Sequence, residues 1–430
     1  MLKGNMLAHH KPEETQLLTI KNIPVDLPDF LFIVADLEGN ILAKQQHHTG
    51  QTSLILKTNK QFEGTKINLF RISANSPTFI DLFAFASLNV NSDFYFSNNY
   101  PVRELDKPIN LKFKNIPVFD KIAASTDWYA NEINNINDTT FFYKIPYNRT
   151  INSDLLMLIE KQNSTYYRMF DINADENNNV LVDLSKVNIK AAKHQVQLPA
   201  GAGNVYATIE GKSITGNAWY RYGRVFSPNQ HLELPVTNSC FKSYACAINF
   251  DMPVDPNINA HWRYGMYSLK LPNKFEPLNI QINSLKYDEK SFQVNYTGES
   301  DGYFAFFMNI KNISGSFPYC YLQSDTNVDV FNWPNFATEL DRPELKMNEF
   351  FLVNLGFIKY NSESYRPYYL SANPIESKGW RTATFAPEWP INTAFGAAGK
   401  LKHKINEAAN TYSNRPDLNT PQSSFLDGSQ

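Results

Sequence analysis

The sequence has few cysteines, few charged residues and no long apolar run. Its 430 residues include three cysteines, Cys240, Cys246 and Cys320, which form no CxxC pair, so we expect neither a disulfide-rich scaffold nor a cysteine zinc site. No stretch of about 18 apolar residues occurs, so we expect no membrane-spanning helix. The net charge is −2 and no long run of Lys or Arg is present, which argues against nucleic acid as a partner.

The common catalytic and metal-binding motifs are missing as well. The chain has no GxSxG nucleophile elbow, P-loop, GxGxxG fingerprint or HExxH pair, and its 8 histidines are scattered, so we expect no cofactor and no metal. His47-His48 follows a predicted strand and is interpreted as an exposed turn. A glycoside hydrolase needs two carboxylates at a set separation in space, which the sequence does not give. The acidic residues considered for that role are Asp127, Glu132, Asp251, Asp255 and Glu388.

The chain is rich instead in residues that build β-sheets. It contains 31 Phe and 23 Tyr, and these strand-favouring residues are interspersed with turn-forming Asn, Pro and Gly. Apolar and polar residues alternate with period two, as at Phe292, Val294 and Tyr296, and such stretches recur throughout with no long helical pattern between them. The pattern predicts an all-β protein of tandem antiparallel β-sandwich domains, immunoglobulin-like or jelly-roll-like.

Several turns predict hairpins. Residues 30–43, 166–184 and 282–296 each place an acidic or Asn-rich turn between two apolar runs. In the first, Glu38-Gly39-Asn40 supplies residues that tolerate positive φ, as a tight hairpin requires. Asp301-Gly302 lies between two further apolar runs and predicts another hairpin.

Residues 171–179, DINADENNN, begin with the oxygen-ligand spacing of a calcium-binding EF-hand loop. Such a loop needs Gly at its sixth position and a bidentate Glu at its twelfth, which here are Glu176 and Val182. Asn and Asp also favour turns without any metal, because their side chains bond to their own backbone. We therefore interpret this stretch as a hairpin tip.

Prolines and polar runs divide the chain into a flexible N-terminal segment (1–14), β-sandwich domains at 15–116, 117–276 and 277–390, and a C-terminal segment (391–430). The middle domain splits near residue 200 in an alternative interpretation. Within 391–412, apolar residues at helical spacing predict a short amphipathic helix, followed by a disordered tail. Its Lys400, Lys402 and Lys404 fit peripheral contact with an anionic membrane or an assembly, or the solvated face of a docked helix.

The most distinctive local feature interleaves aromatic rings with arginine, in WYRYGR at 219–224 and WRYGMY at 262–267. Aromatic faces stack on the apolar face of a sugar, and Arg donates to its hydroxyls. One interpretation is a binding shelf for a glycan or a peptide; the other is strand residues whose rings fill the core while Arg stems cover them. The candidate ligand-binding residues are Trp219, Arg221, Tyr222, Trp262, Arg263 and Tyr264.

Two cysteines raise a structural question. Cys240 and Cys246 flank FKSYA, which is short enough to form a hairpin tip. A local disulfide and separate buried thiols are the two alternatives.

The run FIVADLEGNILA followed by TSLILKT, the Asn-rich turns and the tandem β segments resemble uncharacterised extracytoplasmic β-sandwich proteins of Bacteroidota. The resemblance implies an extracytoplasmic location, in the periplasm, at the outer-membrane surface or secreted, and assumes a signal sequence that is missing from this chain. Read literally, the first residues lack such a signal and indicate the cytoplasm.

Three hypotheses on function follow. The first is a non-enzymatic cell-envelope or secreted protein that binds a glycan or a protein partner, or acts as a scaffold. The second is a carbohydrate-active hydrolase whose carboxylates come from distant strands. The third is a structural subunit of a larger envelope assembly.

Overall fold

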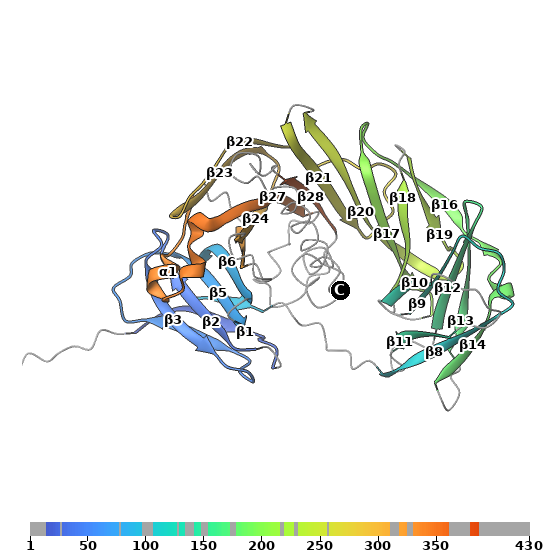
Figure 1. Ribbon diagram of the computed structural model, residues 1–430, viewed down its shortest axis with the longest axis horizontal. Coiled ribbons are helices and arrows are strands. Elements are labelled where there is room, and N and C mark those ends of the chain that lie inside the picture. The colour runs from blue at the N-terminus through green and yellow to red at the C-terminus, as the bar shows by residue number, and fades with distance from the viewer. Residues whose placement is uncertain are drawn as a thin grey trace, which may run out of the picture.

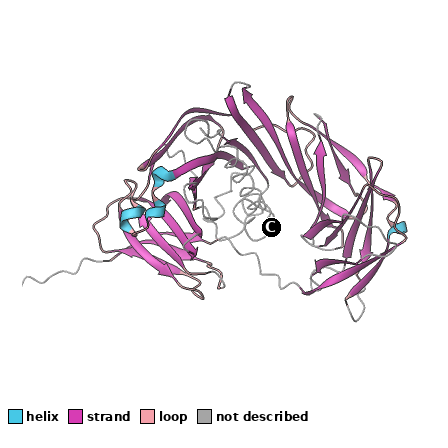
Figure 2. Ribbon diagram, viewed as in Figure 1, coloured by secondary structure: helices cyan, strands magenta, loops and turns pink. Residues whose placement is uncertain are grey.

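The computed structural model describes residues 14–25, 28–76, 79–96, 106–126, 129–133, 142–147, 154–172, 178–215, 219–227, 231–255, 258–309, 318–324, 330–360 and 379–386. These residues form 28 strands and four short helical turns (Figure 2), so the all-β prediction is confirmed. The helical turns are η1 (Leu184–Lys186), α1 (Phe336–Glu339), η2 (Pro343–Leu345) and η3 (Met347–Glu349).

One 12-stranded sheet runs through the molecule as an arc, with β3 towards one end and β18 towards the other (Figure 1). Its strands, in spatial order, are β18 (Trp219–Ser227), β17 (Gly203–Ser213), β20 (Phe241–Asp255), β21 (Ile258–Ser268), β28 (Gly379–Ala386), β27 (Phe350–Tyr360), β24 (Gly302–Asn309), β25 (Tyr319–Ser324), β6 (Phe79–Asn89), β5 (Lys66–Ser76), β2 (Phe30–Ala35) and β3 (Ile41–His47).

Smaller sheets pack beside this one. Near the N-terminus lie β4 (Leu54–Thr58), β1 (Thr15–Lys21) and β7 (Ser92–Tyr95), and later in the chain β22 (Ile280–Tyr287), β23 (Ser291–Gly298) and β26 (Val330–Asn332). The central segment contributes β10 (Tyr129–Ile133), β9 (Lys121–Thr126), β12 (Asp154–Lys161), β13 (Ser164–Asp171) and β15 (Ile189–Lys190), then β11 (Phe142–Tyr147), β8 (Asp106–Lys114) and β14 (Asn179–Asp183), and the pair β16 (Ala192–Gln197) and β19 (His231–Val236).

The long sheet joins segments that are far apart in sequence. β25 runs parallel to β6, with Tyr319 opposite Asp81, and β28 pairs with both β21 and β27. β8, before residue 116, pairs with β11 and β14, after it. These pairings cross the boundaries predicted near residues 116 and 276. That these boundaries separate independently folding domains stays a prediction.

Strand β2, the first strand of the long sheet in sequence, is buried on both faces. Phe32 and Val34 of β2 pack towards β1 and β4, whereas Ile33 and Ala35 pack on the opposite side in a second core. Strands buried on both faces are apolar throughout rather than alternating. This explains why residues 30–35 read FLFIVA.

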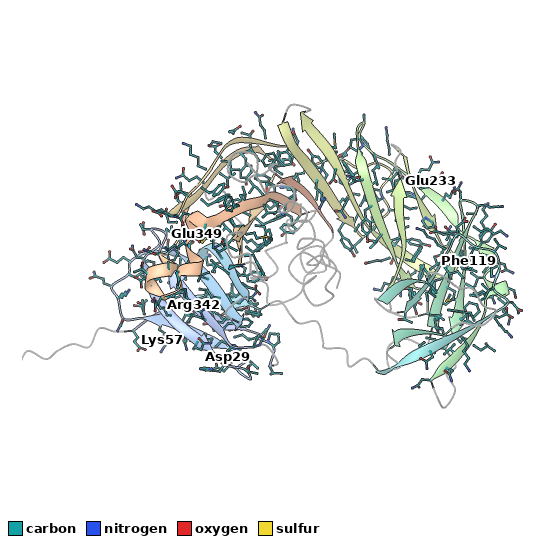
Figure 3. All side chains as sticks on the ribbon, viewed as in Figure 1. Asp29, Lys57, Phe119, Glu233, Arg342 and Glu349 are labelled. Atoms are coloured by element: carbon teal, nitrogen blue, oxygen red, sulfur yellow. The ribbon has the colours of Figure 1, made fainter. Side chains whose placement is uncertain are left out.

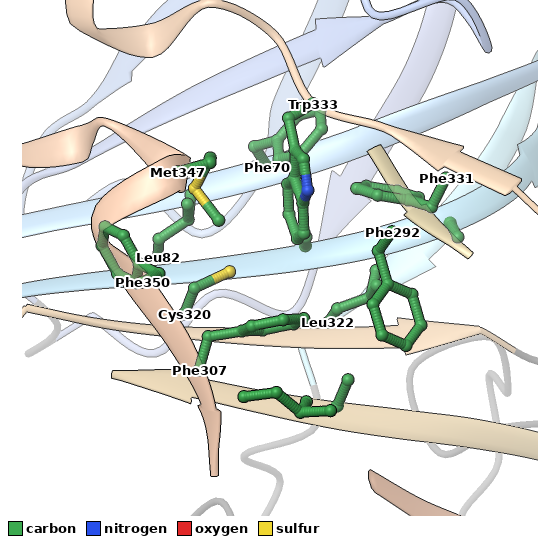
Figure 4. Close-up of a cluster of buried hydrophobic side chains, with 14 of the residues drawn as sticks. Phe70, Leu82, Phe292, Phe307, Cys320, Leu322, Phe331, Trp333, Met347 and Phe350 are labelled. Atoms are coloured by element: carbon green, nitrogen blue, oxygen red, sulfur yellow. The ribbon is translucent and has the colours of Figure 1, made fainter. Parts of the chain in front are cut away.

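That second core joins the beginning and the end of the described chain (Figure 4). The ring of Phe70 on β5 lies 5.8 Å from the ring of Phe331 and 5.1 Å from that of Phe336. Phe307 of β24 packs edge-on against Trp333, with ring centroids 5.7 Å apart. Charged side chains such as Lys57 and Glu233 lie on the outside (Figure 3).

The hairpins predicted at 30–43 and 282–296 are confirmed. Between β2 and β3, the Asp36 carboxylate accepts hydrogen bonds from the backbone N–H groups of Glu38 and Asn40. Gly39 has φ +90°, and a Cβ there would lie 2.9 Å from the backbone oxygen of Trp333, so this turn requires glycine. Between β22 and β23, Asp288 caps the turn in the same way.

Three other turn predictions are wrong. Asp301-Gly302 joins β23 to β24, which lie in different sheets, so no hairpin forms there. Residues 171–179 likewise join β13 to β14, again in different sheets; residues 173–177 lie outside the described part. His47 is fully buried at the end of β3 and only His48 is exposed, because the strand extends one residue further into the core than its polar sequence indicates.

Candidate functional site

The two aromatic–arginine motifs do not form one shelf. Trp219 of β18 lies opposite Lys212 of β17, which lies opposite Ser243 of β20. Trp262 of β21 lies opposite Met252 of β20. Nine residues (252 minus 243) separate these rows along β20, which is about 30 Å at 3.3 Å per strand residue. A ligand that touches both tryptophans would therefore have to span that distance.

In the first motif, Tyr222 is a core residue. Its side chain is 2% exposed, it stacks on Phe241 at a centroid distance of 5.6 Å, and the Thr237 hydroxyl donates a 3.4 Å hydrogen bond to its oxygen. Burial raises the pKa of Tyr222 well above its ordinary value. The side chains of Trp219 and Arg221 lie outside the described part of the structure.

In the second motif, the rings are half-buried and pack on one another. Trp262 stacks on Tyr264 at 6.1 Å and lies 5.5 Å from Phe385, and Tyr264 lies 5.6 Å from Phe250. Arg263 is exposed, and its Nε donates to Asp251 Oδ1 at 3.0 Å. A binding role for these residues stays a prediction.

The disulfide between Cys240 and Cys246 is not formed, because all three cysteines are free. FKSYA is not a hairpin tip but the first part of β20, which begins at Phe241. The five residue steps from Phe241 to Cys246 along β20 span about 17 Å, far beyond the roughly 7 Å Cα separation that a disulfide tolerates.

The acidic residues considered for hydrolysis do not come together in the described part. Asp251 is engaged by Arg263 and by the Asn204 amide, whose Nδ2 lies 3.0 Å from Asp251 Oδ2. The side chains of the other four lie outside the described residues: Asp127, Glu132, Asp255 and Glu388.

Among the residues that the structure describes, no group of three or more His, Cys, Asp or Glu is placed to hold a metal ion. No helix in the same ranges is long and apolar enough to cross a membrane. Residues 391–412, the predicted contact segment, lie outside the described ranges.

A different group of side chains stands out on the long sheet, on the face opposite the core of Figure 4. Six buried or half-buried rings from three adjacent strands gather there, and we call this cluster the aromatic face. Its rings belong to Phe83 and Phe85 of β6, Phe304 and Phe306 of β24, and Tyr319 and Tyr321 of β25. The register places Arg71, Phe83, Tyr321, Phe306 and Asn354 in one row across five strands.

Arg71 lies among three rings at one end of this row. Its guanidinium carbon is 4.0 Å from the centroid of Phe83 and 5.1 Å from those of Phe30 and Phe96. Burial lowers the pKa of Arg71 to about 10, so the group stays a cation at neutral pH and cation–π attraction offsets part of its desolvation. Its Nε is buried and has no hydrogen-bond partner.

Asp81 lies diagonally from Arg71 on the neighbouring strand and is 9% exposed. Its Oδ2 accepts a 3.5 Å hydrogen bond from Ser73, and Tyr319 also bonds to the carboxylate. Its Oδ1 has no partner. Burial raises the pKa of Asp81 to about 6, against the smaller opposing effects of Tyr319 and Arg71.

Two amide oxygens complete the polar set. Gln323 Oε1 on β25 and Asn354 Oδ1 on β27 are buried without a partner, and the Gln323 residue is only 4% exposed. Gln323 lies opposite Phe85, so it faces the same side as the rings. Sequence reasoning missed all four polar residues; the available signal was a single charge inside an apolar strand, as in LFRIS and FIDLF.

No protein-family model matches this chain, and no curated protein matches it. Among solved structures, the chain is similar to the "Crystal structure of tetra-tandem repeat in extending region of large adhesion protein". The identity is 10%, the match covers 80% of this chain and 94% of that chain, and the TM-score is 0.14. A TM-score this low carries no argument about fold or function.

Proposed function

We propose that this chain is a non-enzymatic, extracytoplasmic scaffold protein that binds a glycan or a protein partner. The observation that carries the proposal is the 12-stranded sheet, which runs from β3 near the N-terminus to β18 and includes strands as late as β28. A sheet that is hydrogen-bonded across the whole molecule makes a stiff body with large faces. Such a body suits the display of an extended binding surface better than chemistry in an enclosed site.

The electrostatics of the described residues support binding over catalysis. The described acidic candidate, Asp251, accepts hydrogen bonds from Arg263 and Asn204. The carboxyl group with the raised pKa, Asp81, lies beside the Arg71 cation and aromatic rings, and its described hydrogen-bond partners are Ser73 and Tyr319 rather than a second carboxylate.

The test separates binding from hydrolysis on one sample. The recombinant full chain is incubated with immobilised polysaccharides, and retention and the release of reducing ends are measured together. We expect retention on at least one glycan without release of reducing ends. Release would instead support the hydrolase, and a stable oligomer without glycan retention, measured by light scattering, would support the structural subunit.

A further inference from the structure

We propose that residues 391–412, near the C-terminus, dock on the aromatic face and form the layer that buries it. The partner of this interaction surface is thus a segment of the same chain. The contact lies outside the proposed function, which does not depend on it. It gives an intramolecular role to the segment whose sequence combines apolar residues at helical spacing with lysines.

The aromatic face is buried. Tyr319, Tyr321 and Gln323 of β25 are only 5%, 6% and 4% exposed. Neighbouring rings on the same side of a sheet shield the flanks of such a residue but not its outer end, so burial on this scale requires a second layer of structure over the sheet. The aromatic face therefore has a cover.

The described part of the chain supplies this cover at one end. Over β5 and β6, Phe94 of β7 lies 4.9 Å from the ring of Phe85, and the ring of Phe96 lies 5.1 Å from the guanidinium of Arg71. Over β24 and β25, the described side chains of the cluster all belong to β6, β24 and β25 themselves. On the opposite side, by contrast, the core joins these strands to β23 and β26 of a second sheet. The cover of β24 and β25 thus comes from residues outside the described ranges.

The register shows where the C-terminal segment begins relative to this face. Phe385 of β28 pairs with Leu355 of β27, so Ala386, the last residue of β28, lies level with Asn354. Asn354 is at one end of the row that crosses the aromatic face, and β28 is three strand spacings from β25, which is about 14 Å. Pro387 follows β28 and has no N–H for a further ladder bond. The segment therefore starts beside the face that we propose it covers.

The segment also has suitable length and chemistry. A helix of 22 residues (391–412) is about 33 Å long, and the four strand spacings from β5 to β27 measure about 19 Å. The apolar residues at 394, 398, 401, 405, 408 and 412 fall on one side of such a helix. Three of the four unpartnered atoms on the face are acceptors: Asp81 Oδ1, Gln323 Oε1 and Asn354 Oδ1. The Lys and Asn side chains of the segment are donors, so the two surfaces are complementary.

Three other stretches outside the described ranges adjoin strands of this face, at 97–105, 310–317 and 361–378. The first two, of nine and eight residues, would span at most about 14 Å as a helix, and both are tied to strands at each end. Pro367 and Pro374 exclude a continuous helix in the third. The segment 391–412 is therefore the occupant that the length and the sequence pattern favour.

The experiment is photo-cross-linking in the full chain. Phe306 is half-buried within the aromatic face, so p-benzoylphenylalanine is placed at this position and the digest of the irradiated protein is analysed by mass spectrometry. We expect cross-links from position 306 to residues 391–412. The matched control places the same group at Tyr287 of β22, which is 40% exposed and packs 5.8 Å from Phe307 on the opposite side of the sheet. The control should not cross-link to the segment.

A second readout is hydrogen exchange of full-chain variants that carry the ordinary side chains of the face. Ile405→Asp would bury an unpaired carboxylate against the aromatic rings, so peptides from β24 and β25 should exchange at least about tenfold faster. Asn410→Asp is the matched control, because it introduces the same group about 140° round the helix from Ile405 and should leave exchange unchanged. Peptides from β8 and β12, which pack in a separate core, should stay protected in both variants.

Several results would overturn the inference. Cross-links from position 306 that reach only 97–105, 310–317 or 361–378 would assign the cover to another part of the chain, and cross-linked dimers would assign it to a second copy. Absence of any cross-link would mean that no second layer lies over β24. Equal exchange in Ile405→Asp and Asn410→Asp would likewise refute docking of the apolar side. None of these results changes glycan retention, so the proposed function is judged separately.

Discussion

Removing the ring of Phe70 should destabilise two distant parts of the chain together. Phe70 is fully buried on β5, and its ring packs edge-on against Phe336 at 5.1 Å and lies 5.8 Å from Phe331. Truncating a buried Phe to Ala typically costs about 3–5 kcal/mol of unfolding free energy, through lost burial and the cavity that remains. For a cooperative unit of about 200 residues, this corresponds to a fall of roughly 6 to 20 °C in melting temperature.

The assay is hydrogen exchange followed by mass spectrometry, combined with thermal unfolding. Phe70→Ala should reduce protection in peptides from β5 and β6 and, equally, in peptides from residues 330–360, because both regions share one core. The matched control is Phe113→Ala, since Phe113 is equally buried but lies on β8 in a separate core. The control should reduce protection in β8, β12 and β14 and leave residues 330–360 protected. If Phe70→Ala affected only β5 and β6, the reasoning that the two segments fold as one unit would be refuted.

Three further predictions concern a turn, a carboxyl group and the thiols. Gly39→Ala should lower the melting temperature more than Gly50→Ala. Both glycines have φ near +90°, but only the Cβ added at position 39 would meet backbone, at 2.9 Å. The raised pKa of Asp81, about 6 against 3.8, means that the folded chain binds this proton more tightly than the unfolded chain. Its charged form therefore destabilises the fold above pH 6, and this effect disappears as the pH falls below about 4. Asp81→Asn should accordingly be more stable than the original chain by up to about 3 kcal/mol at pH 7.5 and equal to it near pH 3, as judged from denaturation midpoints; equal stability at both values would contradict the burial argument. Iodoacetamide should label half-buried Cys240 in the native protein and reach Cys246, whose pKa burial raises to about 12, only on unfolding, with no change in intact mass on reduction.

The parts of the fold that the sequence predicts correctly depend on local chemistry. The β2–β3 turn is determined by Asp36, whose carboxylate bonds to N–H groups two and four residues later, and by a glycine at positive φ. Both requirements lie within five residues, so they are visible in the string DLEGN.

The parts that failed depend on pairing between distant strands. Asp301-Gly302 has the composition of a hairpin turn, yet β24 pairs with β25 and β27 because its apolar face fits the shared core. A turn dipeptide constrains the direction of the chain but not the partner of the strand that follows. The second partner of β25 is β6, more than 200 residues earlier, and no local signal encodes that parallel pair.

The candidate site residues show the same contrast between what is local in sequence and what depends on distant strands. The motifs with tryptophan and arginine were conspicuous in sequence, but their rows are about 30 Å apart on the sheet and Tyr222 faces the core. Arg71 and Asn354 are inconspicuous in sequence, and only the register of five strands brings them into one row. A site assembled across strands cannot be read from any single strand.

The two faces of β25 pack into two different clusters of buried side chains. Cys320 and Leu322 point into the core that joins the two ends of the described chain, and Tyr319, Tyr321 and Gln323 point to the aromatic face. Because side chains alternate with period two, neighbouring residues on this strand pack into opposite clusters. All six residues of β25 are buried, so substitutions at 320 and 322 and those at 321 and 323 should all act on unfolding, each pair through a different cluster.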